Sequence, residues 1–193
     1  TPELNIMLGC NAIPREPGLQ FGSRYVISPL EGQVFDYLAP ELFERVRNLE
    51  TFAGMLVVDK WTCNSNGRQA TFWRRLTERK YTVSFIDQGY CFNAGEWTFP
   101  DFPLRGVYCR NEVYSHIRGW DSFGPWLTRI ENLPEEVIWN LASEVPPDWY
   151  GAQWDEMEKL VKTLIERRSM VRELIVAFGT SPRRPFPEWR EAA

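Results

Sequence analysis

The stretch from Val57 to Phe72 constrains the fold of this chain more than any other. Its first residues, Val57-Val58-Asp59-Lys60-Trp61, end an apolar segment with helical spacing. A polar loop follows, and two β-rich runs then flank a polar tip at 77–80, which predicts an antiparallel hairpin over 69–86. Asp87 stands directly after the second run and before Gln88-Gly89. The order of parts is therefore helix, polar loop, hairpin and a lone carboxylate.

Kinase-type phosphotransferases build their catalytic centre from parts in this order. One loop holds the substrate hydroxyl, and an Asp one hairpin later holds the magnesium ion that bridges the phosphates. A tight β-ribbon between the two segments would bring Asn66 and Asp87 into one cleft. We therefore predict that both side chains lie on the same side of the domain.

The composition fits a single globular domain. The chain has 193 residues, 44% hydrophobic and 25% charged, which is long enough to bury a core. It contains 9 Trp, 12 Phe and 7 Tyr. Because each large ring buries much area and anchors a polar tip, these residues predict a rigid, well-filled interior.

Charge and hydropathy exclude several functional classes. The net charge is −4 and no basic block occurs, which argues against nucleic-acid binding. No apolar run approaches the ~20 residues that span a bilayer, so no membrane interaction is expected. The first residues, 1–8, lack the pattern of a signal peptide, which favours a cytoplasmic location. The cysteines form no C-x-x-C pair and His116 is the single histidine, so we expect reduced thiols and no zinc site.

Hydrophobic spacing predicts the remaining elements. Residues 19–27 alternate as a strand does, and 41–61 show helical spacing, as one helix or as a pair broken near Asn48. Four helices are expected after Gly106, over 107–118, 122–131 with Asp121 as N-cap, 134–143 with Pro134 in its first turn, and about 153–178. The fold class is thus α+β, mainly helical, with a central hairpin and one N-terminal strand.

Four pieces of the sequence resemble the bacterial HipA-like kinases, specifically the short HipA-like group, over nearly the whole chain. The pieces are Gly18–Tyr25, Asp59–Ala70, Ile86–Trp97 and Pro103–Gly106. The resemblance implies the C-terminal lobe of a protein-kinase-like fold. It also implies transfer of the γ-phosphoryl group of ATP to a Ser or Thr hydroxyl of a protein substrate, with Mg²⁺ as the metal. Whether a toxin–antitoxin partner exists stays open.

The resemblance also assigns residues to roles. The family's catalytic loop reads Asp-x-His/Arg-x-x-Asn, in which the Asp positions the substrate hydroxyl and the Asn ligates a metal. These three positions fall on Asn66, Arg68 and Thr71, and the metal-binding Asp after the hairpin falls on Asp87. Gln69, together with Asn64 and Asp87, is implied as nucleotide-binding.

Asn66 departs from the family pattern, because an amide cannot take up a proton. The nearby substitutes are the carboxylate of Asp59 and the side-chain carbonyl of Asn64. A non-catalytic, pseudokinase-like module that binds a partner is therefore the alternative function. If it lacks the proton acceptor, a kinase of this kind would lose roughly 10²–10⁴ in rate.

Plainer structural roles remain open for each site residue. Asp87 before Gly fits a turn, and Asn66-Gly67 is a strong turn signal in its own right. Asp59 fits either a proton acceptor or a buried ion pair with Arg68 or Arg105. Arg68 fits loop orientation, phosphate contact or simple solvation.

The resemblance implies a division of the chain. One domain is expected over 1–193, with an inter-lobe strand and loop at 1–40, the catalytic and metal loops at 41–106, a helical subdomain at 107–178 and a tail at 179–193. Residues before Asp59 show no Gly-rich loop and no strand Lys, which a kinase N-terminal lobe supplies. We therefore expect a separated lobe whose missing N-terminal half is a partner. Exposed apolar surface near Leu19, Phe21 and Tyr25 would then favour self-association.

Overall fold

The computed structural model describes residues 5–8, 10–14, 18–19, 21–67 and 69–190. The protein is α+β and mostly helical, with a small antiparallel sheet of three strands in the order β3 (Gly32–Phe35), β4 (Gln69–Arg75) and β5 (Thr82–Ile86). A separate antiparallel pair is formed by β1 (Asn5–Leu8) and β2 (Asn11–Pro14). The expected α+β, mainly helical class is thus confirmed.

The predicted hairpin over 69–86 is present. Strands β4 and β5 pair in antiparallel register, with Gln69 opposite Ile86 at one end and Trp73 opposite Thr82 at the other. The turn that joins them is closed by a hydrogen bond from the Glu78 amide to the Arg75 carbonyl, of 3.0 Å. The open end of the hairpin is therefore the end from which Asn66 and Asp87 continue.

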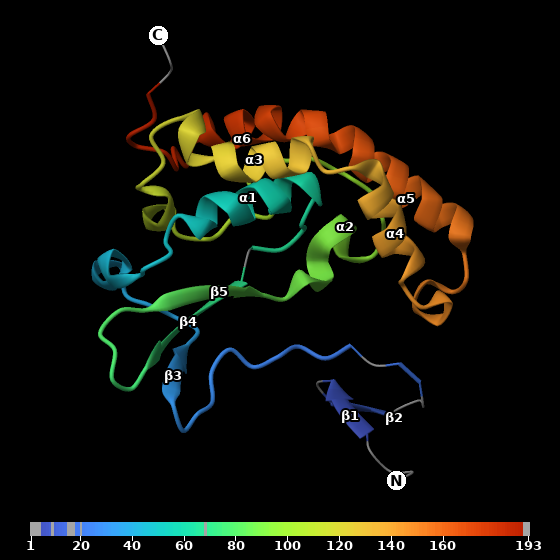
Figure 1. Ribbon diagram of the computed structural model, residues 1–193, viewed down its shortest axis with the longest axis horizontal. Coiled ribbons are helices and arrows are strands. Elements are labelled where there is room, and N and C mark those ends of the chain that lie inside the picture. The colour runs from blue at the N-terminus through green and yellow to red at the C-terminus, as the bar shows by residue number, and fades with distance from the viewer. Residues whose placement is uncertain (1–4, 9, 15–17, 20, 68, 191–193) are drawn as a thin grey trace.

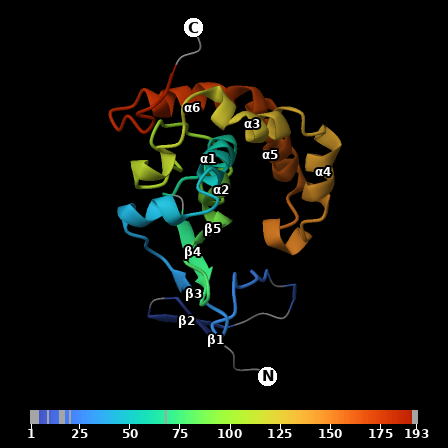
Figure 2. The ribbon, with the colours of Figure 1, turned by 60° about the vertical axis from the view of Figure 1, so that its left-hand side comes forward.

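Helix α1 (Thr51–Trp61) is the central element of the fold. It lies between the sheet below it and helices α3 (Gly124–Glu131) and α6 (Val171–Gly179) above it (Figures 1 and 2). Gly54 permits the close approach of α3, because a Cβ there would come within 2.5 Å of the Trp126 ring. A helix covered on so many sides is buried around most of its circumference, which agrees with the apolar run in the sequence.

The break near Asn48 separates two helical pieces, as one of the two sequence readings proposed. A 3₁₀ turn at Pro40–Arg45 precedes it, and α1 follows. The Asn48 side chain pairs with the Val83 backbone in both directions, at 3.0 Å to the carbonyl and 2.9 Å from the amide. This amide therefore anchors the start of α1 to β5.

The interior consists of two clusters that meet near Trp61. The larger one joins α1 with the inner face of the hairpin, the segment 107–130 and α6. The smaller one lies between α4 (Glu135–Ser143) and α5 (Trp154–Arg167). Trp61 packs against both clusters and donates its indole N–H to the Leu164 carbonyl at 2.8 Å. The expected aromatic interior is thus present.

Several predicted elements are wrong. Of residues 19–27, those that the structure describes form no strand, because no second strand pairs with them, and Leu19, Phe21 and Tyr25 are 64–83% exposed. Residues 107–118 hold only a 3₁₀ turn at Asn111–Tyr114, because the backbone is extended at Arg110.

Two helix boundaries also differ from the prediction. Asp121 lies in a 3₁₀ turn at Trp120–Ser122, and α3 begins only after Phe123, so Asp121 is not its N-cap. The expected helix over 153–178 is two helices, separated by a 3₁₀ turn at Arg168–Met170. Among the described residues, no helix has the length and apolar character needed to cross a membrane.

Candidate functional site

The loop that follows α1 is organised by Asn64. Its side-chain N–H₂ donates to Asp59 Oδ1 at 2.9 Å, and its side-chain carbonyl accepts the Asn66 amide at 3.0 Å. Its backbone amide donates to the Asp59 carbonyl at 3.0 Å. Asp59 and Asn64 are 2% and 1% exposed. Both side chains therefore set the shape of the loop from beneath and do not face solvent.

Backbone hydrogen bonds hold this loop against the segment that follows β5. The Ser65 amide donates to the Tyr90 carbonyl at 2.9 Å. The Phe92 amide donates to the Thr62 carbonyl at 2.7 Å, and the Asn93 amide to the Cys63 carbonyl at 3.3 Å. The loop at 62–66 and the segment 88–93 thus run side by side at the open end of the hairpin.

The segment after β5 has an unusual backbone. Asp87, Phe92, Asn93 and Trp97 have positive φ angles of 58°, 55°, 56° and 51°. Such conformations cost on the order of 1–3 kcal/mol each for residues other than glycine, and they gather at functional sites. Asp and Asn tolerate this region better than a bulky residue such as Phe92. The surrounding contacts therefore hold the segment in a shape it would not adopt alone.

A third loop, 97–106, completes the arrangement and is fixed by Lys60. The Lys60 ammonium donates to the carbonyls of Pro103 and Arg105 at 2.9 and 2.8 Å. Burial lowers the pKa of Lys60 to about 8, opposed by the nearby Asp59 carboxylate among others. Gly106, at φ 69°, packs against the first loop, where a Cβ would come within 2.8 Å of the Asn64 carbonyl.

Arg167 connects the loop 97–106 to the C-terminal helices. Its guanidinium makes two hydrogen bonds to the Asp101 carboxylate, at 2.7 and 2.8 Å, and two more to the carbonyls of Lys60 and Trp61 at 2.8 Å each. It also lies over the Phe99 ring, 4.7 Å from the centroid. Helix α5 is thereby joined to the end of α1.

The residues predicted for the site occupy different environments. Asn66 is half-buried in the first loop, while Asp87 and Gln69 are exposed at the open end of the hairpin. Thr71 lies inside β4 opposite Ser84, three residues before Asp87, so the register separates the two predicted metal ligands.

The remaining predictions concern arginines. Arg68 lies outside the described residues. Arg105 donates to the Asn93 side chain at 2.9 Å and to the Pro100 carbonyl at 3.4 Å. These contacts place Arg105 within the loop 97–106 and hold that loop to Asn93.

A shallow hollow of about 350 Å³ adjoins the open end of the hairpin. Gln69, Thr71 and Ile86 contribute from the two strands, and aromatic and basic side chains contribute from neighbouring segments. Its full lining is Asp36, Tyr37, Gln69, Ala70, Thr71, Ile86, Tyr108, Cys109 and Arg110. Two of the predicted nucleotide and metal positions, Gln69 and Thr71, therefore face a common space.

Asp87 fits a magnesium ion that arrives with a phosphate-bearing ligand. Mg²⁺ is usually held by one or two carboxylates together with water and substrate phosphates. Asp87 supplies one exposed carboxylate, and the half-buried Asn66 is the last residue of the neighbouring loop 62–66. Among the described residues there is no group of three His, Cys, Asp or Glu side chains arranged to hold a metal by themselves. A metal ion at Asp87 would therefore have to take its other ligands from water or from a bound phosphate.

Sequence reasoning did not assign roles to Lys60, Gly106, Asp101 and Arg167. Lys60 carried a usable signal, since Asp59 and Lys60 are two charges near the end of a largely apolar helical run. The contact between Arg167 and Asp101 joins residues 66 positions apart and left no local signal. Comparison with family models, curated proteins and solved structures produced no match.

Proposed function

We propose that this chain carries part of a magnesium-dependent phosphotransferase site of the HipA-like kinase type. The observation that supports it best is the hydrogen-bonded pairing of the loop 62–66 with the segment 88–93 at the open end of the hairpin. This pairing puts the loop that carries Asn66 beside the segment that begins with Asp87. The order helix, loop, hairpin and Asp is the order in which kinases place their hydroxyl-binding loop and their metal-binding Asp.

In this proposal each residue has a limited task. Asp87 would hold the ion, and a bound Mg²⁺ would neutralise charge on the phosphates of ATP. Asn66 would accept a hydrogen bond from the substrate hydroxyl without removing its proton. Asn64 and Asp59 would keep the loop in shape, since both are buried and bonded to each other. Thr71 has no metal-binding role in this proposal, because it pairs with Ser84 inside the hairpin, away from Asp87.

A non-catalytic binding module is the second candidate, and the burial of Asp59 favours it. A proton acceptor must reach the substrate hydroxyl to within hydrogen-bond distance. Asp59 is 2% exposed and accepts the Asn64 amide, so it does not reach solvent in this arrangement. With Asn66 at the surface of the loop, nucleotide binding without efficient transfer is the outcome that this geometry favours.

Partners follow from the same proposal. Leu19, Phe21, Tyr25 and Leu30 are 64–89% exposed, and this part of the chain lies on the sheet side of the molecule (Figure 1). We propose that an N-terminal kinase lobe covers this face and contributes the phosphate-covering loop and Lys. Without that lobe, we expect weak nucleotide binding and a tendency of the chain to self-associate at high concentration.

Nuclear magnetic resonance titration tests the site even when binding is weak. Mg²⁺-ATP at millimolar concentration should shift the amide signals of 63–66 and 86–90, and Mn²⁺ in place of Mg²⁺ should broaden them. Asp87→Ala should remove both effects, whereas Asp148→Ala, which alters an exposed Asp in a 3₁₀ turn, should leave them unchanged. Shifts confined to other regions, or equal shifts in both variants, would reject the proposed site.

Phosphorylation of a protein substrate, measured with an N-terminal lobe supplied, separates the two candidates. Asn66→Asp restores the acidic group of the family pattern, so a phosphotransferase should gain activity by roughly 10²- to 10⁴-fold. A binding module should gain none while it keeps its response to Mg²⁺-ATP. The titration with the unchanged protein serves as the reference for both results.

A further inference from the structure

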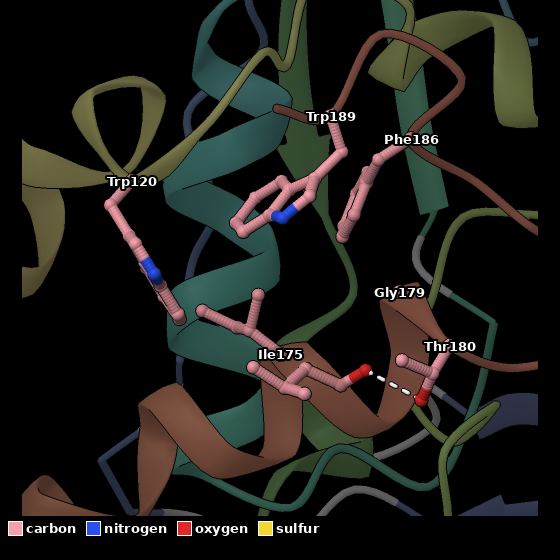
Figure 3. A pocket seen from close by; sticks show the side chains of 7 residues that line it. Trp120, Ile175, Gly179, Thr180, Phe186 and Trp189 are labelled. Atoms are coloured by element: carbon pink, nitrogen blue, oxygen red, sulfur yellow. Dashed lines mark hydrogen bonds between the residues drawn. The ribbon is translucent and has the colours of Figure 1, made fainter. Parts of the chain in front are cut away.

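A second hollow lies on the opposite side of α1 from the hairpin. It has a volume of about 420 Å³ and opens between α6, the 3₁₀ turn at Trp120–Ser122 and the C-terminal tail (Figure 3). Its lining is Trp120, Ile175, Val176, Gly179, Thr180, Phe186 and Trp189. A volume of this size lies within the range of ~300–1,000 Å³ that small-molecule sites occupy.

Aromatic rings form rigid walls around this hollow. Phe186 and Trp189 stack with their planes 28° apart and their centroids at 5.5 Å, and Trp120 meets Trp189 edge-on at 5.3 Å. Phe186 is 8% exposed and packs against the fully buried Phe178, with a centroid distance of 5.5 Å. Because the core fixes these rings, little side-chain ordering is needed when a ligand enters.

Two hydrogen-bond donors in the lining have no acceptor among the residues that the structure describes. The indole N–H groups of Trp120 and Trp189 make no hydrogen bond within the described part of the chain, whereas those of Trp61 and Trp73 do. Figure 3 shows the Trp189 nitrogen on the edge of its ring that faces the other lining side chains. The Thr180 hydroxyl is already used, since it donates to the Val176 carbonyl at 3.0 Å. Neither N–H group is sealed from solvent, so a ligand that covers them displaces their water and should bring an acceptor of its own.

The charges at the rim argue against a cationic ligand. None of the lining residues is acidic. The Arg172 guanidinium lies 5.2 Å from the centre of the Trp120 ring and is paired with Glu131 at 2.6 Å. One face of that ring is therefore already covered by a guanidinium, whose positive charge disfavours a second cation nearby.

We propose that this hollow binds a small, flat aromatic molecule that carries a hydrogen-bond acceptor, such as an aromatic carboxylate. The rings supply apolar contact area, and the free indole N–H groups select for the acceptor. This site is separate from the hairpin and does not depend on the phosphotransferase proposal.

Three small probes that differ in ring and charge test the ligand class. They are 2-naphthoate, which is aromatic and carries an acceptor, 2-naphthylmethylammonium, which is aromatic and cationic, and octanoate, which has an acceptor but no ring. We expect 2-naphthoate to bind most tightly and to shift the indole N–H resonances of Trp120 and Trp189, assigned through Trp→Phe variants. Equal binding of octanoate, tighter binding of the cation, or unshifted indole signals would overturn the assignment.

Two variants locate the binding. Val176→Phe should fill the hollow and weaken 2-naphthoate by at least about tenfold. Val137→Phe is its control, because both valines are exposed helix residues, at 44% and 39%. Trp189→Phe keeps a ring but removes a donor and should weaken binding roughly two- to tenfold. Circular dichroism confirms folding, and equal affinity in all three variants would place the ligand elsewhere.

Discussion

The two sides of α1 share aromatic packing but differ in their loops. Rings pack on both sides, as Phe52 does with Phe85 of the hairpin and Phe178 does with Phe186. On the hairpin side, loops are in addition held by hydrogen bonds to backbone carbonyls and contain residues in left-handed conformations. Directional contacts fix polar groups in one geometry, whereas ring packing mainly supplies stability. This difference is why the hairpin side is the candidate for chemistry.

The largest expected effect comes from removing Arg167, which holds the loop 97–106 on the hairpin side. Arg167→Ala should lower the free energy of unfolding by roughly 3–5 kcal/mol, because it removes a buried guanidinium and leaves two carbonyls and the partly exposed Asp101 carboxylate without their partner. Urea denaturation measures this change. Arg172→Ala is the matched control, since its contact with Glu131 is equally short, at 2.6 Å, but 47% of its side chain is exposed. A loss of at most about 1 kcal/mol is expected there. Equal losses would show that burial does not strengthen the Arg167 contact.

Removing a buried ring on the α6 side should lower the free energy of unfolding by a similar amount, but it should loosen a different region. Phe178→Ala removes a fully buried ring and should cost about 3–5 kcal/mol. Phe102→Ala, with 62% of the residue exposed, should change stability little. Amide hydrogen exchange distinguishes the two regions. Arg167→Ala should speed exchange mostly in the loop 97–106, and Phe178→Ala should speed it across α1 and α6. Identical exchange patterns in the two variants would show that Arg167 and Phe178 stabilise the same region.

A pair of glycines isolates the close contact between two loops. Gly106 and Gly151 have similar φ angles of 69° and 63°, but a Cβ at Gly106 meets the Asn64 carbonyl at 2.8 Å, whereas at Gly151 it meets nothing within 4 Å. Gly151→Ala should therefore cost only the left-handed backbone penalty, about 1–2 kcal/mol. Gly106→Ala should cost more and should shift the Asn66 amide signal. Equal losses in the free energy of unfolding would mean that Gly106 does not pack closely against the loop 62–66.

Local sequence patterns predicted the elements on the hairpin side, but they did not predict the tertiary contacts between those elements. The hairpin over 69–86, the break near Asn48 and the position of α1 follow from alternation, turn residues and helical spacing, which are local properties. The segment 19–27 shows the limit of such patterns, because alternation alone cannot supply a neighbouring strand. The stretch 107–118 fails for a related reason, since its buried residues are placed by contacts with α1 and not by a helical period.

The candidate site was only partly predictable for the same physical reason. The positions of Asn66 and Asp87 before and after the hairpin followed from local patterns, and their functional roles stay predictions. Lys60, Asp101 and Arg167 are joined by hydrogen bonds between residues as many as 107 positions apart in the sequence, and no local pattern encodes such contacts. Asp59 was placed among the catalytic residues because it is acidic and close in sequence. Its burial beneath Asn64 became visible only in three dimensions.

The smallest expected effect concerns pH and the single histidine. Burial lowers the pKa of His116 below its usual value, against the smaller opposing effects of the Glu50 carboxylate and the Val113 backbone. A group with a depressed pKa in the folded state contributes stability above its unfolded pKa of about 6.5, and that stability is lost as the pH falls. The Glu50 carboxylate opposes the shift, so the loss should be modest. Thermal unfolding between pH 7.5 and about 5 should therefore show a steeper decline in the wild type than in His116→Leu, because Leu cannot bind the proton. Carboxylates contribute to both proteins alike and cancel in the difference. Parallel curves for the two proteins would show that the folded environment leaves the histidine's proton affinity unchanged.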